Sequence, residues 1–322
     1  MVVIWFSAVE LRNLQSIDNW TAMTKLVIFD LDGTLLDTVE DLGNATNYAL
    51  RMCGFPERPL KDYYQLVGRG IYNLFRSAMQ APDEGKVTLP DRGNEAASVE
   101  GNVPVPVEAG APTSDASKAP VPDEAGAPTS DASKAPVPDE EMVSRMASYF
   151  LPYYGEHMCD FTRPYPGIPE MLASLATAGI QVALASNKYQ EGAEKLIRRF
   201  FPDIPFMKVL GQREGQPIKP DPQVVFQIMA GAPEVGPQSL PTDKQPFDPV
   251  LGPQSLPSDR QTFAPEDVAY VGDSNVDMQT GLNAGVRTIG VTWGFRDRTE
   301  LEAFHPYAVV DTVKELQDLL MG

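Results

Sequence analysis

The sequence contains 322 residues, of which 43% are hydrophobic, and its formal net charge at pH 7 is −18. The length accommodates two modest domains, and the negative charge argues against a surface for nucleic acid or anionic membranes, because phosphate groups repel such a protein. Two cysteines are too few for a disulfide framework or a zinc site, and no apolar run reaches transmembrane length, so we expect a cytoplasmic protein without nucleic-acid or membrane partners.

Residues 1–22 open with the apolar run MVVIWF and then become polar. No basic segment precedes the run and no small-residue cleavage site follows it, so the pattern is not typical of a signal peptide or an anchor. Met23 stands just before an apolar stretch that reads as the first buried strand. We therefore predict that residues 1–22 are an extension outside the folded domains.

The next part of the chain predicts one strand followed by helices only. Leu26–Phe29 is a short apolar run, typical of a buried strand. Apolar residues then recur at three and four positions over Val39–Met52, which predicts an amphipathic helix. Two more helices are predicted over Tyr64–Met79 and Glu141–Tyr154. Because the stretch 38–163 has no predicted strand, we expect it to be a helical cap inserted into another domain.

After this stretch, strands and helices alternate. The predicted strands are Gln181–Ala185, Phe206–Leu210, Val268–Val271, Val286–Val291 and Ala308–Val310. The predicted helices are Pro169–Ala178, Glu191–Phe200, Pro222–Met229, Met278–Ala284 and Val313–Leu320. This alternation predicts an α/β fold with a Rossmann-like parallel sheet and helices on both faces. The α/β core then consists of residues 23–37 and 164–322.

Two segments interrupt this pattern with repeated sequence. Residues 108–123 (EAGAPTSDASKAPVPD) recur unchanged as residues 124–139, inside a segment, 82–140, that is rich in proline and acidic residues. A looser repeat of the same period lies within residues 231–263. The units have too few apolar residues to build a core, so we predict disordered or extended insertions, the first within the cap and the second within the α/β core.

The end of the first strand carries two carboxylates. Asp30 and Asp32 are two residues apart, so an extended chain turns both to the same side. Paired carboxylates can divide their roles, one ionised and the other protonated. Ligands of open α/β sheets bind at the carboxyl ends of the strands, which places this pair where a site is expected.

Other strand ends add groups that suit a metal and an anion. Ser186 and Asn187 follow one strand, Lys219 precedes a helix, and Asp273 and Asp277 follow another strand. Carboxylates together with water and substrate phosphate are the ligands that Mg²⁺ prefers, and the lysine, hydroxyl and amide groups can hold phosphoryl oxygens. Asp277 also suits the N-cap of the helix that follows, and this alternative stays open.

Four segments together resemble the motifs of the haloacid dehalogenase-like hydrolase superfamily. They are FDLDGTLLDT (29–38), SN (186–187), KPD (219–221) and GDSNVDM (272–278). The inserted helical cap and the segments RPYPGI (163–168), GQREG (211–215) and VTWGF (291–295) resemble the phosphoglycolate phosphatase-like branch. Four motifs in order, each at a predicted strand end, make the resemblance specific.

The resemblance implies a role for each matched residue. It implies Asp30 as the nucleophile that forms an aspartyl-phosphate, and Asp32 as its acid and base. It implies Mg²⁺ held by the carboxylates of Asp30 and Asp273 and the main-chain carbonyl of Asp32, with Asp277 as a ligand or a neighbour of the ligands. It implies phosphoryl binding by Ser186, Asn187 and Lys219. Arg69, in a glycine-flanked segment of the cap, is a candidate substrate contact or part of a plain turn between helices.

The predicted function is therefore an Mg²⁺-dependent phosphomonoesterase for a small phosphorylated metabolite, with phosphoglycolate as the favoured substrate. Two alternatives remain. A phosphomutase of the β-phosphoglucomutase type would share all four motifs, and a non-catalytic scaffold would use the acidic repeats instead of the carboxylates.

Overall fold

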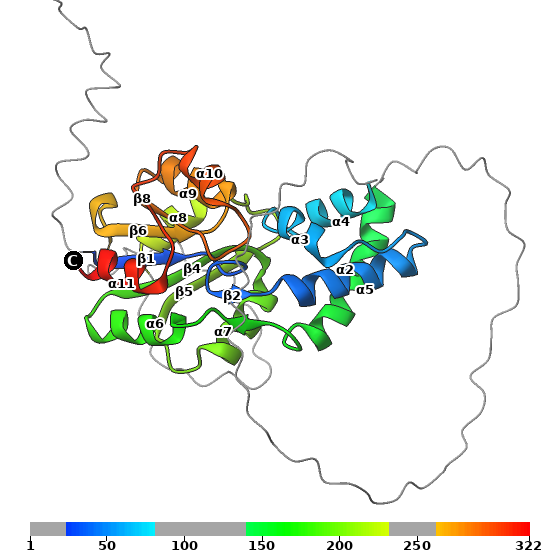
Figure 1. Cartoon of the computed structure of the whole chain (residues 1–322), viewed down its shortest axis with the longest axis horizontal. Helices are drawn as coiled ribbons and strands as arrows, with labels where there is room; N and C mark the ends of the chain where they lie inside the picture. Colours follow the sequence, from blue (N-terminus) through cyan, green and yellow to red (C-terminus); the bar gives the residue numbers. More distant parts are fainter. Residues whose placement is uncertain (1–23, 81–139, 232–261) are drawn as a thin grey trace, which may run out of the picture. The chain divides into compact units, whose positions relative to one another are not determined.

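The computed structural model describes residues 24–80, 140–231 and 262–322 (Figure 1). These residues all fall within one compact unit. The predicted extension of residues 1–22 and nearly all of the two predicted insertions lie outside the described residues. Within the described part of the chain, none of the helices is both long enough and apolar enough to cross a membrane.

A parallel sheet of six strands forms the centre of the α/β core. Across the sheet, the strands lie in the order β5 (Phe206–Gln212), β4 (Gln181–Tyr189), β1 (Leu26–Phe29), β6 (Val268–Gly272), β7 (Arg287–Val291) and β8 (Ala308–Val310). Because β1 pairs with β4 on one side and β6 on the other, it is an interior strand. Its carboxyl end therefore lies between the carboxyl ends of its two neighbours.

Helices cover both faces of the sheet, as the alternation predicts. The residues of β1 are all buried, and Val27 and Phe29 face one apolar cluster whereas Leu26 and Ile28 face another. The first face packs against α6 (Ile168–Thr177), α7 (Gln190–Phe200) and α11 (Val313–Met321). The second packs against α8 (Gln223–Met229) and α9 (Asn275–Ala284).

The cap consists of four described helices, α2 (Val39–Met52), α3 (Leu60–Leu66), α4 (Ile71–Met79) and α5 (Glu140–His157). Their apolar faces join the cluster on the first face of the sheet. A two-stranded antiparallel ribbon, β2 (Leu36–Asp37) with β3 (Arg163–Pro164), holds the two connections between cap and core side by side (Figure 1). The predicted insertion of a helical cap is confirmed.

The prediction of one helix over Tyr64–Met79 was wrong, because the structure has two. The chain breaks between α3 and α4 where Gly68 and Gly70 have φ angles of 117° and 81°. Side chains with a Cβ rarely adopt this left-handed region, so the two glycines permit a turn that the apolar spacing does not reveal. The turn matters for the site, since its backbone lies against the core.

Other differences concern boundaries and short elements. Strand β4 continues to Tyr189 instead of ending at Ala185, so that the polar residues expected after the strand are part of it. The helix predicted from Met278 begins three residues earlier, because Ser274 caps its first turn. The sequence did not predict β2, β3, the helix α10 (Arg298–Glu302) or the 3₁₀ turn Pro265–Asp267.

Candidate active site

Three carboxylates meet at the carboxyl ends of β1 and β6. Asp30 follows β1 directly and its amide donates a hydrogen bond of 2.9 Å to the carbonyl of Val271 on β6. Asp273 follows β6 and Asp277 lies in the first turn of α9. One oxygen from each of the three side chains lies within 4.8 Å of the others, and all three residues are buried. The sheet thus assembles residues that are more than 240 positions apart in the sequence.

The turn after β1 requires a glycine beside this cluster. Gly33 has a φ of +92°, and a Cβ built on it would lie 2.3 Å from an oxygen of Asp273. Thr34 then donates a hydrogen bond of 3.1 Å from its hydroxyl to Oδ1 of Asp273. The amide of Phe295 donates one of 2.6 Å to Oδ2. Asp273 is therefore held from two sides by groups that favour its ionised form.

Lys219 is the cation of the cluster. Its Nζ donates hydrogen bonds of 2.7 Å to Oδ1 of Asp30, 2.7 Å to Oδ1 of Asp277 and 3.0 Å to the carbonyl of Ala185. Only 4% of the residue is exposed. An ammonium group has three donors, so these bonds engage all of them. Phosphoryl binding by Lys219 stays a prediction.

Asp277 is engaged through both oxygens. Oδ1 also accepts from the hydroxyl of Tyr270 at 3.1 Å, and Oδ2 accepts from the amide and hydroxyl of Ser274. Ser274 is the N-cap of α9, and Asp277 is the third residue of that helix in a reciprocal capping box. The alternative that Asp277 is the N-cap was wrong, because the N-cap is Ser274, three residues earlier. Asp277 supports that cap and also belongs to the carboxylate cluster.

Burial and crowding oppose the ionisation of these carboxylates. Burial, with the nearby charge of Asp277, raises the pKa of Asp30 well above its ordinary value, against the opposing effect of Lys219. Burial and Asp277 also raise the pKa of Asp273, to about 7. For Lys219, burial lowers the pKa, but Asp277 and Asp30 outweigh it and raise the pKa well above the ordinary value.

The donor set fits a small hard cation. Three carboxylates offer oxygen ligands within a buried cluster. Among its described neighbours, Lys219 pairs with two of them, Asp30 and Asp277. In the described residues no hydrogen bond engages Oδ2 of Asp30, which leaves that oxygen available for a metal or a substrate. Oxygen ligands in this number are typical of Mg²⁺ sites, which complete their shells with water and phosphate.

Asp32 is held by a different lysine. Nζ of Lys188 lies 2.9 Å from its Oδ1, and the hydroxyl of Thr38 donates a hydrogen bond of 2.7 Å to the same oxygen. The side chain of Asp32 is separate from the three-carboxylate cluster, but Asp32 and Asp30 line the same cavity. The two carboxylates thus face one space with different partners, as acid and base roles require.

Ser186 and Asn187 lie near the end of β4, on the rim of this cavity. Oγ of Ser186 accepts a hydrogen bond from the amide of Lys188 at 3.2 Å, so its hydroxyl hydrogen remains a donor. The amide group of Asn187 donates to the carbonyls of Gly68 and Lys219, both at 3.1 Å. Its oxygen accepts from the amide of Lys219 at 2.8 Å. Asn187 therefore joins the cap to the core, and direct contact with a phosphoryl group stays a prediction.

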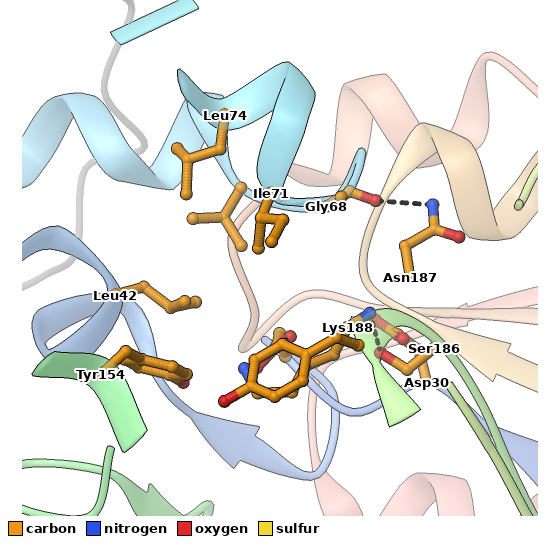
Figure 2. A pocket seen from close by; sticks show the side chains of 13 residues that line it. Asp30, Leu42, Gly68, Ile71, Leu74, Tyr154, Ser186, Asn187 and Lys188 are labelled. Carbon is orange, nitrogen blue, oxygen red and sulfur yellow. Dashed lines mark hydrogen bonds and ion pairs between the residues drawn. The ribbon is translucent and has the colours of Figure 1, made fainter. Parts of the chain in front are cut away.

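The cap closes the cavity from the opposite side. Figure 2 shows Leu42, Ile71 and Leu74 of the cap facing Asp30 and Ser186 of the core. Tyr154 of α5 also borders the cavity, and its ring lies 4.8 Å from Nζ of Lys188. The volume of this cavity is about 30 Å³.

Arg69 is exposed and does not line this cavity. It borders a different hollow, together with Lys219 and residues of α9. Its neighbours Gly68 and Gly70 do line the site, so the turn predicted as a candidate contact reaches the cavity through its backbone. A substrate contact by the Arg69 side chain stays a prediction.

Sequence reasoning missed four residues that shape the site. Lys188, Thr34 and Thr38 hold the carboxylates, and Tyr154 borders the cavity from the cap. The position of Lys188, directly after the SN pair, was a usable signal. Tyr154 gave none, because its place in the apolar stripe of α5 is equally typical of a core residue.

Comparison with known proteins assigns this sequence to a family. A model described as haloacid dehalogenase-like hydrolase matches residues 27–98 and 122–233, more than half of the chain. The chain belongs to the haloacid dehalogenase-like hydrolase family. A second model of the same kind, described as HAD-hydrolase-like, matches residues 219–316.

Relatives of this hydrolase align over nearly their whole length. The phosphoglycolate phosphatase of Haemophilus influenzae is 24% identical over 298 residues, which cover 92% of this chain and 98% of the relative. That of Neisseria meningitidis is 26% identical over 297 residues, covering 91% and 92%. The crystal structure of a predicted phosphoglycolate phosphatase from Haemophilus somnus has a TM-score of 0.61 at 20% identity, covering 93% of this chain and 99% of that one.

At such identity the structural likeness shows the fold. The predicted superfamily and the α/β fold with a helical cap are thus confirmed, and the matches support the expected enzyme class, a phosphatase.

Proposed function

We propose that this haloacid dehalogenase-like hydrolase removes the phosphoryl group from a small phosphomonoester through an aspartyl-phosphate on Asp30. The observation that carries the proposal is the pair Asp30 and Asp32, which line one enclosed cavity while two different lysines hold them. A single aspartate at a strand end could be explained as a turn residue. Two carboxylates with separate cationic partners suit a nucleophile and an acid/base.

The first step divides the work between these residues. Oδ2 of Asp30 forms a bond to phosphorus while the bond from phosphorus to the ester oxygen breaks, and Asp32 gives its proton to the departing oxygen. Lys219 holds Asp30 in position through its 2.7 Å hydrogen bond, and the hydroxyl of Ser186, which keeps its hydrogen free, would donate to a phosphoryl oxygen.

The second step releases phosphate and restores the enzyme. Asp32, now ionised, accepts a proton from a water whose oxygen bonds to phosphorus, and the bond between phosphorus and Asp30 breaks. Lys188 and Thr38 keep Asp32 directed at the cavity during both transfers. In this scheme one residue serves first as acid and then as base, as reversibility requires.

We propose Mg²⁺ as the cofactor, held by Asp30 and Asp273 with Asp277 as a ligand or immediate neighbour, and with the main-chain carbonyl of Asp32 as a further ligand. When bound, the ion would offset the negative charge of the phosphoryl group and the carboxylates. The raised pKa of Asp273 supports this assignment, since three buried carboxylates share one lysine and a bound cation would add the missing positive charge.

The substrate we favour is phosphoglycolate. The relatives carry that name, and the small cavity with its aliphatic cap wall suits a leaving group of few atoms. Because aliphatic side chains of the cap line the cavity opposite the core, we propose that the cap moves relative to the core as the substrate enters and leaves. We propose a cytoplasmic location, which the two free cysteines favour.

A phosphate-release assay over small phosphomonoesters, with and without Mg²⁺, tests this function. We expect Mg²⁺-dependent release, fastest with 2-phosphoglycolate, and no requirement for a sugar bisphosphate. If phosphate is released only as a side reaction while a sugar phosphate is isomerised in the presence of a sugar bisphosphate, the phosphomutase alternative replaces the proposal. No release from any ester would refute both the nucleophile and the acid/base assignments.

A further inference from the structure

The cavity contains one buried polar atom that the mechanism does not use. Tyr154 is fully buried, and its hydroxyl has no hydrogen-bond partner in the described residues. Buried hydroxyls are nearly always paired, because an unpaired one loses its hydrogen bond to water without replacement. An unpaired hydroxyl that borders an enclosed site therefore indicates a group that is absent from the protein itself.

The ring of Tyr154, which lines the cavity, is held on both sides. On one side it stacks on Phe150, with ring centroids 5.1 Å apart, and on the other it contacts the ammonium group of Lys188. Figure 2 shows Tyr154 extending from α5 toward the space below Leu42. Burial raises the pKa of the phenol well above its ordinary value, so the group acts as a hydrogen-bond donor.

Lys188 adds a second donor beside this tyrosine ring. Its ammonium group binds Asp32, and an ammonium has three donors. Both residues line the cavity, and the rest of the cap wall is formed by Leu42, Val67 and other aliphatic side chains. A sugar with several hydroxyls would find few partners on this wall, whereas a short group with one acceptor end would find two donors together.

We propose that Tyr154 and Lys188 form a subsite for a carboxylate on the leaving group, with Tyr154 as a specificity-determining residue supplied by the cap. The inference rests on the proposed phosphatase function and deepens it. It restricts the substrate class to short phosphomonoesters whose leaving alcohol carries a carboxylate close to the ester oxygen. In this arrangement the phenol donates to the carboxylate while the core performs the transfer.

The test compares two esters that differ only at the proposed contact. In ethyl phosphate a methyl group replaces the carboxylate of 2-phosphoglycolate, and both have the same reacting phosphate. For the wild-type protein with Mg²⁺ we expect kcat/KM to be at least roughly tenfold higher for 2-phosphoglycolate, the scale of a hydrogen bond to a charged group. Equal values for the two esters would overturn the subsite while leaving phosphatase function intact.

The variant Tyr154→Phe removes only the hydroxyl and keeps the ring against Lys188. We expect the ratio of the two kcat/KM values to fall by roughly tenfold, mainly through a higher KM for 2-phosphoglycolate, with ethyl phosphate little affected. Tyr153→Phe is the matched control, because this neighbour on α5 stacks on Tyr48 and does not line the cavity. Its ratio should equal that of the wild type.

The outcomes separate this inference from the function on which it rests. An unchanged ratio in Tyr154→Phe, or an equal loss for both esters, would overturn the subsite and leave a structural role or a buried water for the hydroxyl. Absence of release from both esters and from the wider set would instead refute the phosphatase function. If Tyr154→Phe does not fold, the wild-type preference for 2-phosphoglycolate over ethyl phosphate decides alone.

Discussion

The core and the cap line the same cavity with opposite chemistry. The core contributes Asp30, Asp32 and Lys188 from the carboxyl ends of its strands, whereas the cap contributes aliphatic side chains and the phenol of Tyr154. In the core each of these charged groups has a partner at hydrogen-bond distance. The difference supports the proposed division, in which the core transfers the phosphoryl group and the cap selects the leaving group.

The two regions also differ in how they are held together. Groups of the core cluster are linked by short charged hydrogen bonds within one rigid sheet edge. Contacts between cap and core include the Asn187 bond to Gly68 and the bonds of Arg296 to carbonyls at the end of α3. Substitutions in the core cluster should therefore abolish phosphate release, while substitutions at the contacts between cap and core should change its rate.

The largest effect is expected at the nucleophile. Asp30→Asn should reduce phosphate release to background, because a carboxamide does not form the aspartyl-phosphate. The fold should persist, since Asp277 still pairs with Lys219. Phosphate release and circular dichroism measure the two properties. Activity near the wild-type level would remove Asp30 from the mechanism and break the assignment of chemistry to the core.

Metal dependence should follow Asp273. We expect Mg²⁺ to raise the melting temperature of the wild type, because it binds only the folded cluster, and we expect Asp273→Asn to lose most of that increase. Asp203→Asn, at an exposed position of the core, is the control. Differential scanning fluorimetry with and without Mg²⁺ provides the measurement. An undiminished increase in Asp273→Asn would contradict the proposed site.

The same site predicts a pH dependence. With its pKa raised to about 7 by burial and Asp277, Asp273 binds a proton more tightly in the folded than in the unfolded state, where its pKa is about 4. Without metal, its contribution to stability therefore falls as the pH rises from about 4 to about 7. Since the proton and the metal compete for this carboxylate, the stabilisation by Mg²⁺ should grow over the same range.

A smaller effect is expected at the contact between cap and core. Arg296, almost fully buried, donates to the carbonyls of Tyr64, Gln65 and Val67 at the end of α3. Arg296→Met should lower kcat/KM by roughly tenfold, because the closed state loses hydrogen bonds from a charged donor. The increase in melting temperature with Mg²⁺ should stay, which distinguishes loss of closure from loss of the metal site.

Arg298→Met serves as the control for this change. Arg298 lies two residues further on and pairs with Glu302 and Asp311, both in the core. It should leave steady-state kinetics close to the wild type. If Arg296→Met also has wild-type kcat/KM, this arginine has no part in closure and the contrast between rigid core and adjustable cap is weakened.

The smallest effect is expected from the repeated segment. The site described above is built from side chains outside residues 82–138, within the part of the chain that the structure describes. Nη2 of Arg76 on α4 lies 2.6 Å from a carboxylate oxygen of Glu140 on α5. A short linker can therefore join these helices. Replacing residues 82–138 with a glycine–serine linker should leave kcat/KM within about twofold of the wild type in the phosphate-release assay. A large loss would show that the repeats take part in the work of the cap and would revive the scaffold alternative.

Much of the core could be predicted from local patterns. The strand Leu26–Phe29 was predicted with the boundaries that the structure has, and the helix from Val39 with the same first residue, because the spacing of apolar residues shows which face is buried. The break at Gly68 did not follow from this spacing, since the residues on both sides of it keep a helical period. The signal was in the glycines at 68 and 70, which left a turn between helices open as an alternative.

The sequence by itself determined the chemistry at the strand ends. Asp30, Asp32, Lys219, Asp273 and Asp277 could be named because a parallel sheet brings its carboxyl ends together, whatever lies between the strands. Tertiary structure alone decided the partners. The pairing of Asp32 with Lys188, the pairing of Asp277 with Lys219, and the unpaired hydroxyl of Tyr154 depend on distances between side chains from separate parts of the chain. Such distances follow from side-chain packing, which the spacing of residues along the chain does not predict.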